Sequence, residues 1–141
     1  MRAEPVTILH VEDDDVDAMA IERGFRRLAL APPIVRAKDG YEALEILRGT
    51  HAGQRLHQPF VVLLDWSLPR MGGGELLARM RADRELRTAV VFVLTTSRDP
   101  ADRLAAYELN VAGYLVKSDR TEELLPALAM IAQYGRVVEL P

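Results

Sequence analysis

Polar side chains directly follow four of the five apolar runs in this chain of 141 residues. The first run is followed by the acidic stretch Glu12–Asp15, the third by Asp65, the fourth by Thr95 and the fifth by Lys117. When parallel strands share a sheet, their carboxyl ends meet at one edge, and functional sites lie there. We therefore expect these carboxylates, this hydroxyl and this ammonium group to lie close together.

Such a set of side chains could bind a divalent cation and a phosphate group. Carboxylates gathered from two strands repel one another unless a cation lies among them, and oxygen ligands favour a hard dication such as Mg²⁺. Lys117 would supply a positive charge, and Thr95 a hydroxyl donor, for phosphate oxygens. The structural alternative for a single acidic residue is a helix cap, and we expect Asp14 or Asp15 to cap the helix that follows.

The elements that position these side chains can be read from hydrophobic periodicity. Strands are expected at 6–11, 34–37, 60–64, 89–94 and 113–116, and helices at 16–29, 41–47, 75–80 with a polar extension, 101–109 and 122–133. Alternating strands and helices predict right-handed βαβ units in an α/β sandwich of three layers. The strand at 60–64 lacks polar alternation, which is typical of a parallel strand covered on both faces.

Composition excludes several classes of protein. The chain has no cysteine, which excludes disulfides, Cys-ligated zinc and thiol catalysis, and its net charge of −3 argues against nucleic-acid binding through bulk charge. Apolar runs such as 60–64 and 89–94 are far shorter than the ~20 residues of a membrane helix. No apolar stretch of signal-peptide length follows Met1. We expect one cytoplasmic domain without a membrane partner.

The strand ends resemble the receiver domain of bacterial two-component response regulators. Four motifs carry the resemblance, in order: Val-Glu12-Asp13-Asp, Leu-Leu-Asp65-Trp-Ser-Leu-Pro69, Leu-Thr95-Thr-Ser and Gly-Tyr114-Leu-Val-Lys117. The resemblance implies a flavodoxin-like (βα)5 fold, with a parallel five-stranded sheet of order 2-1-3-4-5. It assigns residues 1–133 to the receiver domain and leaves 134–141 as a C-terminal tail.

The resemblance implies a phosphorylation switch. Asp65 would accept a phosphoryl group from a kinase histidine, Lys117 would pair with the phosphate, and the Thr95 hydroxyl would move to contact it. Thr95 is preferred to Thr96 because it directly follows the apolar run and keeps the family's separation from Lys117. Tyr114 would swing inward as Thr95 moves, and so change the surface made by the fourth helix, fifth strand and fifth helix.

The resemblance also implies a Mg²⁺ site. Asp13, the carboxylate of Asp65 and the backbone carbonyl of Ser67 would bind the ion directly. Glu12 would reach it through water.

Three short segments, Leu94–Ser97, Ala106–Leu109 and Lys117-Ser118, are most similar to the single-domain regulators of phytochrome-type histidine kinases. This similarity implies a bacteriophytochrome as the kinase partner. About eight residues follow the fifth helix, so we expect protein–protein output without a DNA-binding domain, and a signalling protein rather than an enzyme. The tail and the Tyr107/Leu109 face predict a homodimer, against the alternative that the tail covers the chain's own fifth helix.

Two residues depart from the family pattern. Ser118 replaces the usual proline after the lysine, and Gly72 stands where the family often has Asp, which makes Gly72–Gly74 a permissive loop. These departures leave open a second hypothesis, a phosphorylation-independent receiver-like scaffold or dimerisation module. A Mg²⁺-dependent phosphotransferase or hydrolase is a third, disfavoured because no Asp-x-Asp pair begins at Asp65. His10 is expected to be a packed, neutral histidine within the first strand.

Overall fold

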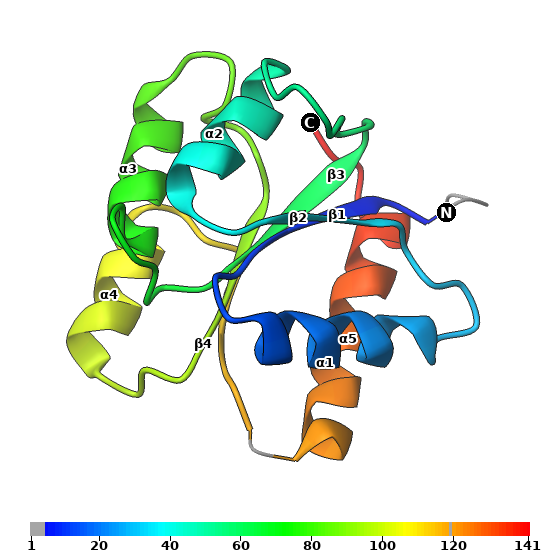
Figure 1. Ribbon diagram of the computed structural model, residues 1–141. Coiled ribbons are helices and arrows are strands. Elements are labelled where there is room, and N and C mark those ends of the chain that lie inside the picture. The colour runs from blue at the N-terminus through cyan, green and yellow to red at the C-terminus, as the bar shows by residue number, and fades with distance from the viewer. Residues whose placement is uncertain (1–4, 119) are drawn as a thin grey trace.

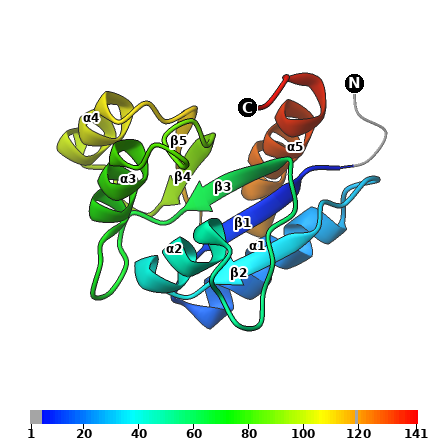
Figure 2. The same cartoon turned by 90° about the horizontal axis from the view of Figure 1, so that it is seen from above.

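A computed structural model of the chain describes residues 5–118 and 120–141. The elements in chain order are β1 (Thr7–Val11), α1 (Asp15–Arg26), β2 (Ile34–Ala37), α2 (Gly40–Arg48), β3 (Phe60–Leu64), α3 (Gly73–Ala82), β4 (Val91–Thr95), α4 (Pro100–Glu108), β5 (Gly113–Val116) and α5 (Thr121–Val137). All neighbouring strands are parallel, and their order is β2-β1-β3-β4-β5, as Figure 2 shows. The expected flavodoxin-like sheet order is confirmed.

Helices cover both faces of the sheet, so the domain has two apolar cores. Leu9 and Val11 of β1 pack in the core formed with α2, α3 and α4, whereas Ile8 packs in the core formed with α1 and α5. Figure 1 shows these two helix layers on opposite sides of the strands. Because successive strand residues point to opposite faces, a strand buried on both sides must be apolar throughout.

The register of the strands brings their carboxyl ends to one edge. Val11 of β1 lies opposite Leu64 of β3, and Thr95 of β4 lies opposite Val116 of β5. Glu12, Asp65 and Lys117, which directly follow three of these residues, are therefore delivered to the same edge.

Aspartates cap three of the helices. Asp14 caps α1, Asp39 caps α2 and Asp99 caps α4, and in each case the side chain accepts a hydrogen bond from a backbone N–H of the first turn. Of the two residues expected to cap the first helix, the structure assigns Asp14.

The fifth helix is longer than its local periodicity predicts. It runs to Val137, so the part of the expected tail from Tyr134 to Val137 is helical. The Tyr134 ring packs edge-to-face on Phe92 of β4, with ring centroids 5.2 Å apart. Local hydrophobic periodicity cannot predict this contact, because the two residues are far apart in the sequence. No helix among the described residues, α5 included, is long and apolar enough to cross a membrane.

Candidate functional site

Three carboxylates meet at the carboxyl edge of the sheet. Glu12 and Asp65, the residues directly after β1 and β3, are buried, with 1% and 6% of their surfaces exposed. Asp13 lies exposed beside them, and one oxygen of each carboxylate lies within 4.8 Å of the others. Oxygen donors of this kind fit a hard divalent cation, which would offset the repulsion among them.

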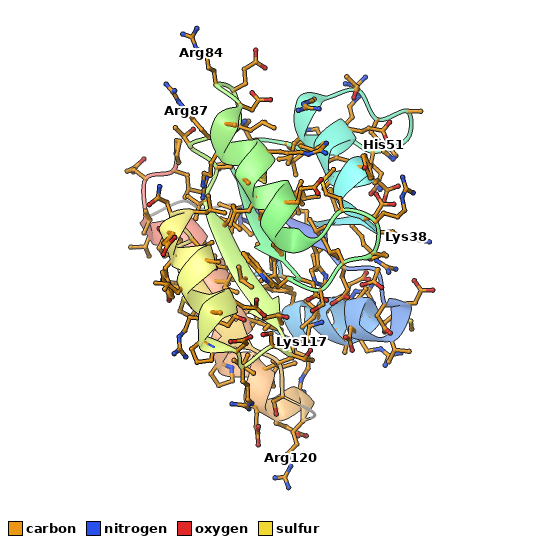
Figure 3. All side chains as sticks on the ribbon, turned by 90° about the vertical axis from the view of Figure 1, so that its left-hand side faces the viewer. Lys38, His51, Arg84, Arg87, Lys117 and Arg120 are labelled. Carbon is orange, nitrogen blue, oxygen red and sulfur yellow. The ribbon has the colours of Figure 1, made fainter. Side chains whose placement is uncertain are left out.

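Lys117 lies over these carboxylates from the end of β5, and Figure 3 shows it beside the start of α1. Its Nζ donates to Glu12 Oε1 at 2.6 Å, to Asp17 Oδ2 at 3.0 Å and to Asp65 Oδ2 at 3.2 Å. Burial alone would lower the pKa of Lys117, but the hydrogen bond to Glu12 and the charges of Asp65 and Glu12 outweigh it and raise the pKa. The ammonium group therefore stays charged.

Glu12 is the carboxylate most affected by its surroundings. Burial raises the pKa of Glu12 to about 7, the hydrogen bond from Lys117 opposes this rise, and the charge of Asp65 adds to it. The second oxygen, Oε2, accepts from the Asp14 N–H at 3.3 Å. A cation bound at this edge would favour the charged form of Glu12.

Backbone contacts hold Asp65 in place. Its N–H donates to the Val11 carbonyl at 3.1 Å, and its Oδ1 accepts from the Ser67 N–H at 3.1 Å. Gly73 packs directly against this segment, because a Cβ there would lie 2.5 Å from the Asp65 carbonyl oxygen and 2.7 Å from the Cα of Trp66. The loop after Asp65 therefore requires a glycine at position 73.

Thr95 and Tyr114 both contact Ser97, in the loop between β4 and α4. Thr95 is fully buried, and its Oγ1 accepts from the Ser97 N–H at 3.3 Å. The Tyr114 hydroxyl donates to the Ser97 carbonyl at 3.0 Å, and the Lys117 N–H donates to the Thr95 carbonyl at 2.7 Å. Thr96, by contrast, is exposed. The β4–α4 loop thus connects the two residues predicted to switch.

The chain after Lys117 is held by a hydroxyl where the family usually has a proline. Ser118 Oγ hydrogen-bonds to the carboxylate of Glu123 in α5 and accepts from the Arg120 N–H at 3.2 Å. These bonds connect the end of β5 to the first turn of α5. Asp119 lies outside the described residues.

Asp17 is a site residue that the sequence reasoning missed. It lies in the first turn of α1, and its carboxylate contacts Lys117. Its position three residues after the cap Asp14 is typical of an acidic residue that serves only the helix terminus. No local pattern indicated its contact with Lys117, because that lysine lies 100 positions further along the chain.

His10 is buried within β1, as expected, with 2% of its surface exposed. Burial lowers its pKa to about 3, and the charges of Lys117 and Arg36 act in the same direction. His51, in the loop after α2, contacts Glu42 at 3.3 Å, and Figure 3 shows it away from Lys117.

A comparison with known families decides among the classes of protein that could use such an edge. The sequence model of the response regulator receiver domain matches residues 8–129, which is most of the chain. The chain belongs to the response regulator receiver family. Receiver domains act in two-component signalling, so the role of this receiver lies in a two-component phosphorelay.

Two relatives span nearly the whole receiver. It is 39% identical over 131 residues to the probable methanogenesis regulatory protein FilR2 of Methanothrix harundinacea, covering 93% of this chain and 84% of that protein. It is 31% identical over 138 residues to the response regulator Rcp1 of Synechocystis sp., covering 97% of this chain and 94% of Rcp1.

Solved structures match the fold of the receiver closely. The Mn²⁺-bound form of Rcp1 superposes with a TM-score of 0.84 at 31% identity, covering 97% of this chain and 99% of the other. The phosphorylated cyanobacterial phytochrome response regulator RcpA superposes with a TM-score of 0.84 at 29% identity, covering 99% of both chains. The similarity therefore includes both the sheet and the helices around it.

Proposed function

We propose that Asp65 of this receiver accepts a phosphoryl group from a histidine of a partner kinase. The observation that carries the proposal is the position of Lys117 Nζ, 3.2 Å from Asp65 Oδ2 at an edge where Glu12 and Asp13 also converge. In the transfer, the bond between phosphorus and the histidine nitrogen breaks, and a bond to an Asp65 oxygen forms. Lys117 stabilises the charge that develops on the phosphate oxygens.

The proposed metal is Mg²⁺, held by Asp13, Asp65 and the backbone carbonyl of Ser67, with Glu12 contributing through water. When bound, the ion neutralises charge on the phosphoryl oxygens. The acidic cluster supports this proposal, as does the Mn²⁺-bound structure of Rcp1.

The proposed switch passes from Thr95 to Tyr114 and then to the surface of α4, β5 and α5. The shared contact with Ser97 supports this route, since a movement of the Thr95 hydroxyl toward phosphate breaks its bond to the Ser97 N–H. The output is protein–protein contact, without nucleic acid, and we propose a signalling protein rather than an enzyme.

The proposed kinase is of the phytochrome type. The phytochrome response regulator RcpA supports this partner, since it matches nearly the full length of the chain.

The proposed homodimer uses the exposed apolar side chains of α4. Leu104 and Tyr107 are 60% and 48% exposed and lie one turn apart, whereas Leu109 packs against the core. In the tail region Val137 is 56% exposed, while Leu140 packs on the chain's own core. Sedimentation with and without beryllofluoride tests the dimer. We expect the wild type to have a dimeric mass and Tyr107→Glu a monomeric mass. A monomeric wild type under both conditions contradicts the proposed dimer.

Trp66 provides the experiment that tests phosphorylation chemistry. It is the only tryptophan in the chain, it follows Asp65, and its ring packs partly buried against the core. We expect Mg²⁺ and then beryllofluoride, a mimic of the phosphoryl group, to change its fluorescence in the wild type and not in Asp65→Asn. If the fluorescence of Asp65→Asn changes as much as that of the wild type, the assignment of Asp65 is contradicted. If the fluorescence of the wild type does not change and calorimetry finds no Mg²⁺ binding, the phosphorylation-independent scaffold explains the protein better.

A further inference from the structure

All the donors of Lys117 are occupied by carboxylates of this chain. A lysine ammonium group has three N–H donors, and these meet Glu12, Asp17 and Asp65. Two of the partners are buried at the strand ends, but Asp17 comes from α1 and its side chain is 46% exposed. The Asp17 bond thus connects α1 to the end of β5.

Asp17 is available for this contact because another residue serves the helix terminus. In a capping box, the acidic residue three positions after the cap accepts from the backbone N–H of the cap residue. Here Glu12 Oε2 accepts from the Asp14 N–H at 3.3 Å, while the Asp17 N–H donates to Asp14 Oδ1 at 2.9 Å. The Asp17 carboxylate is therefore directed to Lys117.

We propose that Asp17 is a positioning residue, which holds Lys117 in the unphosphorylated protein and releases it when Asp65 carries a phosphoryl group. The inference rests on the proposed function of Asp65. The phosphoryl oxygens lie beyond the Asp65 carboxylate oxygen that Lys117 now contacts, so the ammonium group must shift outward to reach them. That shift requires it to give up its bond to either Glu12 or Asp17. Releasing Glu12 removes a hydrogen-bond donor from a side chain that is 1% exposed, whereas water readily solvates the half-exposed carboxylate of Asp17.

The structure leaves room for this exchange. A cavity of about 310 Å³ lies between α1 and the β5–α5 loop, and Asp17 and Lys117 both line it, together with Val16, Ala20, Thr96 and Leu124. Breaking the Asp17–Lys117 bond opens the side chain of Asp17 to this space. Phosphorylation then removes an ion pair between α1 and β5, so the exposed face of α1 also differs between the two states.

Beryllofluoride binding at saturating Mg²⁺, followed through Trp66 fluorescence, tests the release. We expect Asp17→Asn to bind beryllofluoride about threefold or more tightly than the wild type, because Lys117 no longer has to leave a charged partner. Asp17→Glu keeps the charge and should restore wild-type binding. Asp15→Asn removes an equal charge from the same helical turn, where Asp15 pairs with Arg36, and should leave binding unchanged.

Two outcomes overturn the inference. One is equal or weaker binding by Asp17→Asn, which shows that Asp17 does not compete for Lys117. The other is a shift of the same size in Asp15→Asn, which reduces the effect to the general loss of negative charge.

A measurement without metal tests the Asp17–Lys117 contact independently of phosphorylation at Asp65. The chain has only two lysines, Lys38 and Lys117, so protein labelled with ¹³C at lysine Cε gives two assignable NMR signals. With chelator present, we expect Asp17→Asn to move the Lys117 signal and leave the exposed Lys38 signal in place. An unmoved Lys117 signal overturns the contact itself. If the Lys117 signal moves but beryllofluoride affects no variant, the proposed function and the release both fail, and the contact is only a structural ion pair.

Discussion

His10 is a titratable side chain in the interior of a parallel sheet, paired across the strands with Arg36. Burial lowers its pKa to about 3, and the positive charges of Lys117 and Arg36 add to that effect, while Asp65 opposes it. Glu12, two residues further along, is shifted upward to a pKa of about 7, again mainly by burial. Both residues are therefore held neutral at pH values where the unfolded chain would ionise them.

These two shifts affect stability with opposite signs as pH falls. Between pH 6.5 and 3 the unfolded chain protonates His10 and the folded chain does not, so the His10 contribution to stability is lost as pH falls. Between pH 7 and 4.5 the folded chain protonates Glu12 first, so stability is gained as pH falls. Because the two contributions oppose each other, the pH dependence of the unfolding free energy of the wild type does not separate them, and a variant is needed.

His10→Leu isolates the histidine. Relative to its value at pH 8, the free energy of unfolding of the wild type should fall by about 2 kcal/mol more than that of His10→Leu by pH 5, because only the wild type has a histidine to protonate on unfolding. Urea titrations of both proteins at several pH values, with chelator present, measure the difference. Parallel pH profiles would show that His10 titrates normally in the folded chain.

At the scale of elements, the β3–α3 loop is less permissive than three consecutive glycines predict. Arg70, whose φ of 64° is in the left-handed region, contacts Asp39 at 3.3 Å and lies over the Tyr41 ring at 4.8 Å, so the loop is tied to the start of α2. Within the glycine run, Gly73 packs against the Asp65 backbone, whereas nothing lies near the position of a Cβ on Gly72. Close packing therefore requires glycine at position 73 but not at position 72.

Substitution of these two glycines should have opposite effects. Gly72 caps α3 with extended backbone and no side-chain hydrogen bond, so Gly72→Ser should add a cap and stabilise the protein by about 0.5–1 kcal/mol without adding a charge. Gly73→Ala should destabilise it by about 2 kcal/mol or more, because the Cβ meets backbone. Thermal unfolding of both variants measures this, and equal effects at the two positions contradict the close approach at Gly73.

At the scale of the molecule, the two ends of the sheet are built differently. The carboxyl end gathers carboxylates around Lys117, and the opposite end is held by Arg81 of α3. Arg81 donates to backbone carbonyls of Arg87, Ala89, Leu109 and Asn110, at distances of 2.7 to 3.1 Å. Figure 3 shows Arg84 and Arg87 at the end of the molecule away from Lys117. One side chain thus connects α3, the entry to β4 and the α4–β5 turn.

Arg81→Ala should therefore destabilise the whole domain. Four carbonyls lose a charged donor, and we expect a loss of about 2–3 kcal/mol in the free energy of unfolding. Arg84→Ala, three residues further along and exposed, is the matched control and should change stability by less than about 0.5 kcal/mol. Equal effects in urea unfolding would show that the Arg81 contacts are dispensable.

Much of the fold was predictable because strand, helix and turn signals agree locally. The strands β2, β3 and β5 lie where their apolar runs predicted, and the register then brings Glu12, Asp65 and Lys117 to one edge. The end of α5 was not predictable, because it depends on Tyr134 packing on Phe92, 42 residues earlier in the chain. Asp17 was missed for a related reason: its contact with Lys117 joins residues 100 positions apart.

Trapping the acyl phosphate shows whether Asp65 carries the phosphoryl group. The protein would be incubated with Mg²⁺ and a small phosphodonor, then reduced with borohydride, which converts a phosphorylated aspartate to homoserine, and mapped by peptide mass spectrometry. We predict homoserine at position 65 alone, lost on chelation of Mg²⁺ and in Asp65→Asn. Homoserine at another aspartate, or none in a protein that binds Mg²⁺, would show that Asp65 is not the phosphorylated residue.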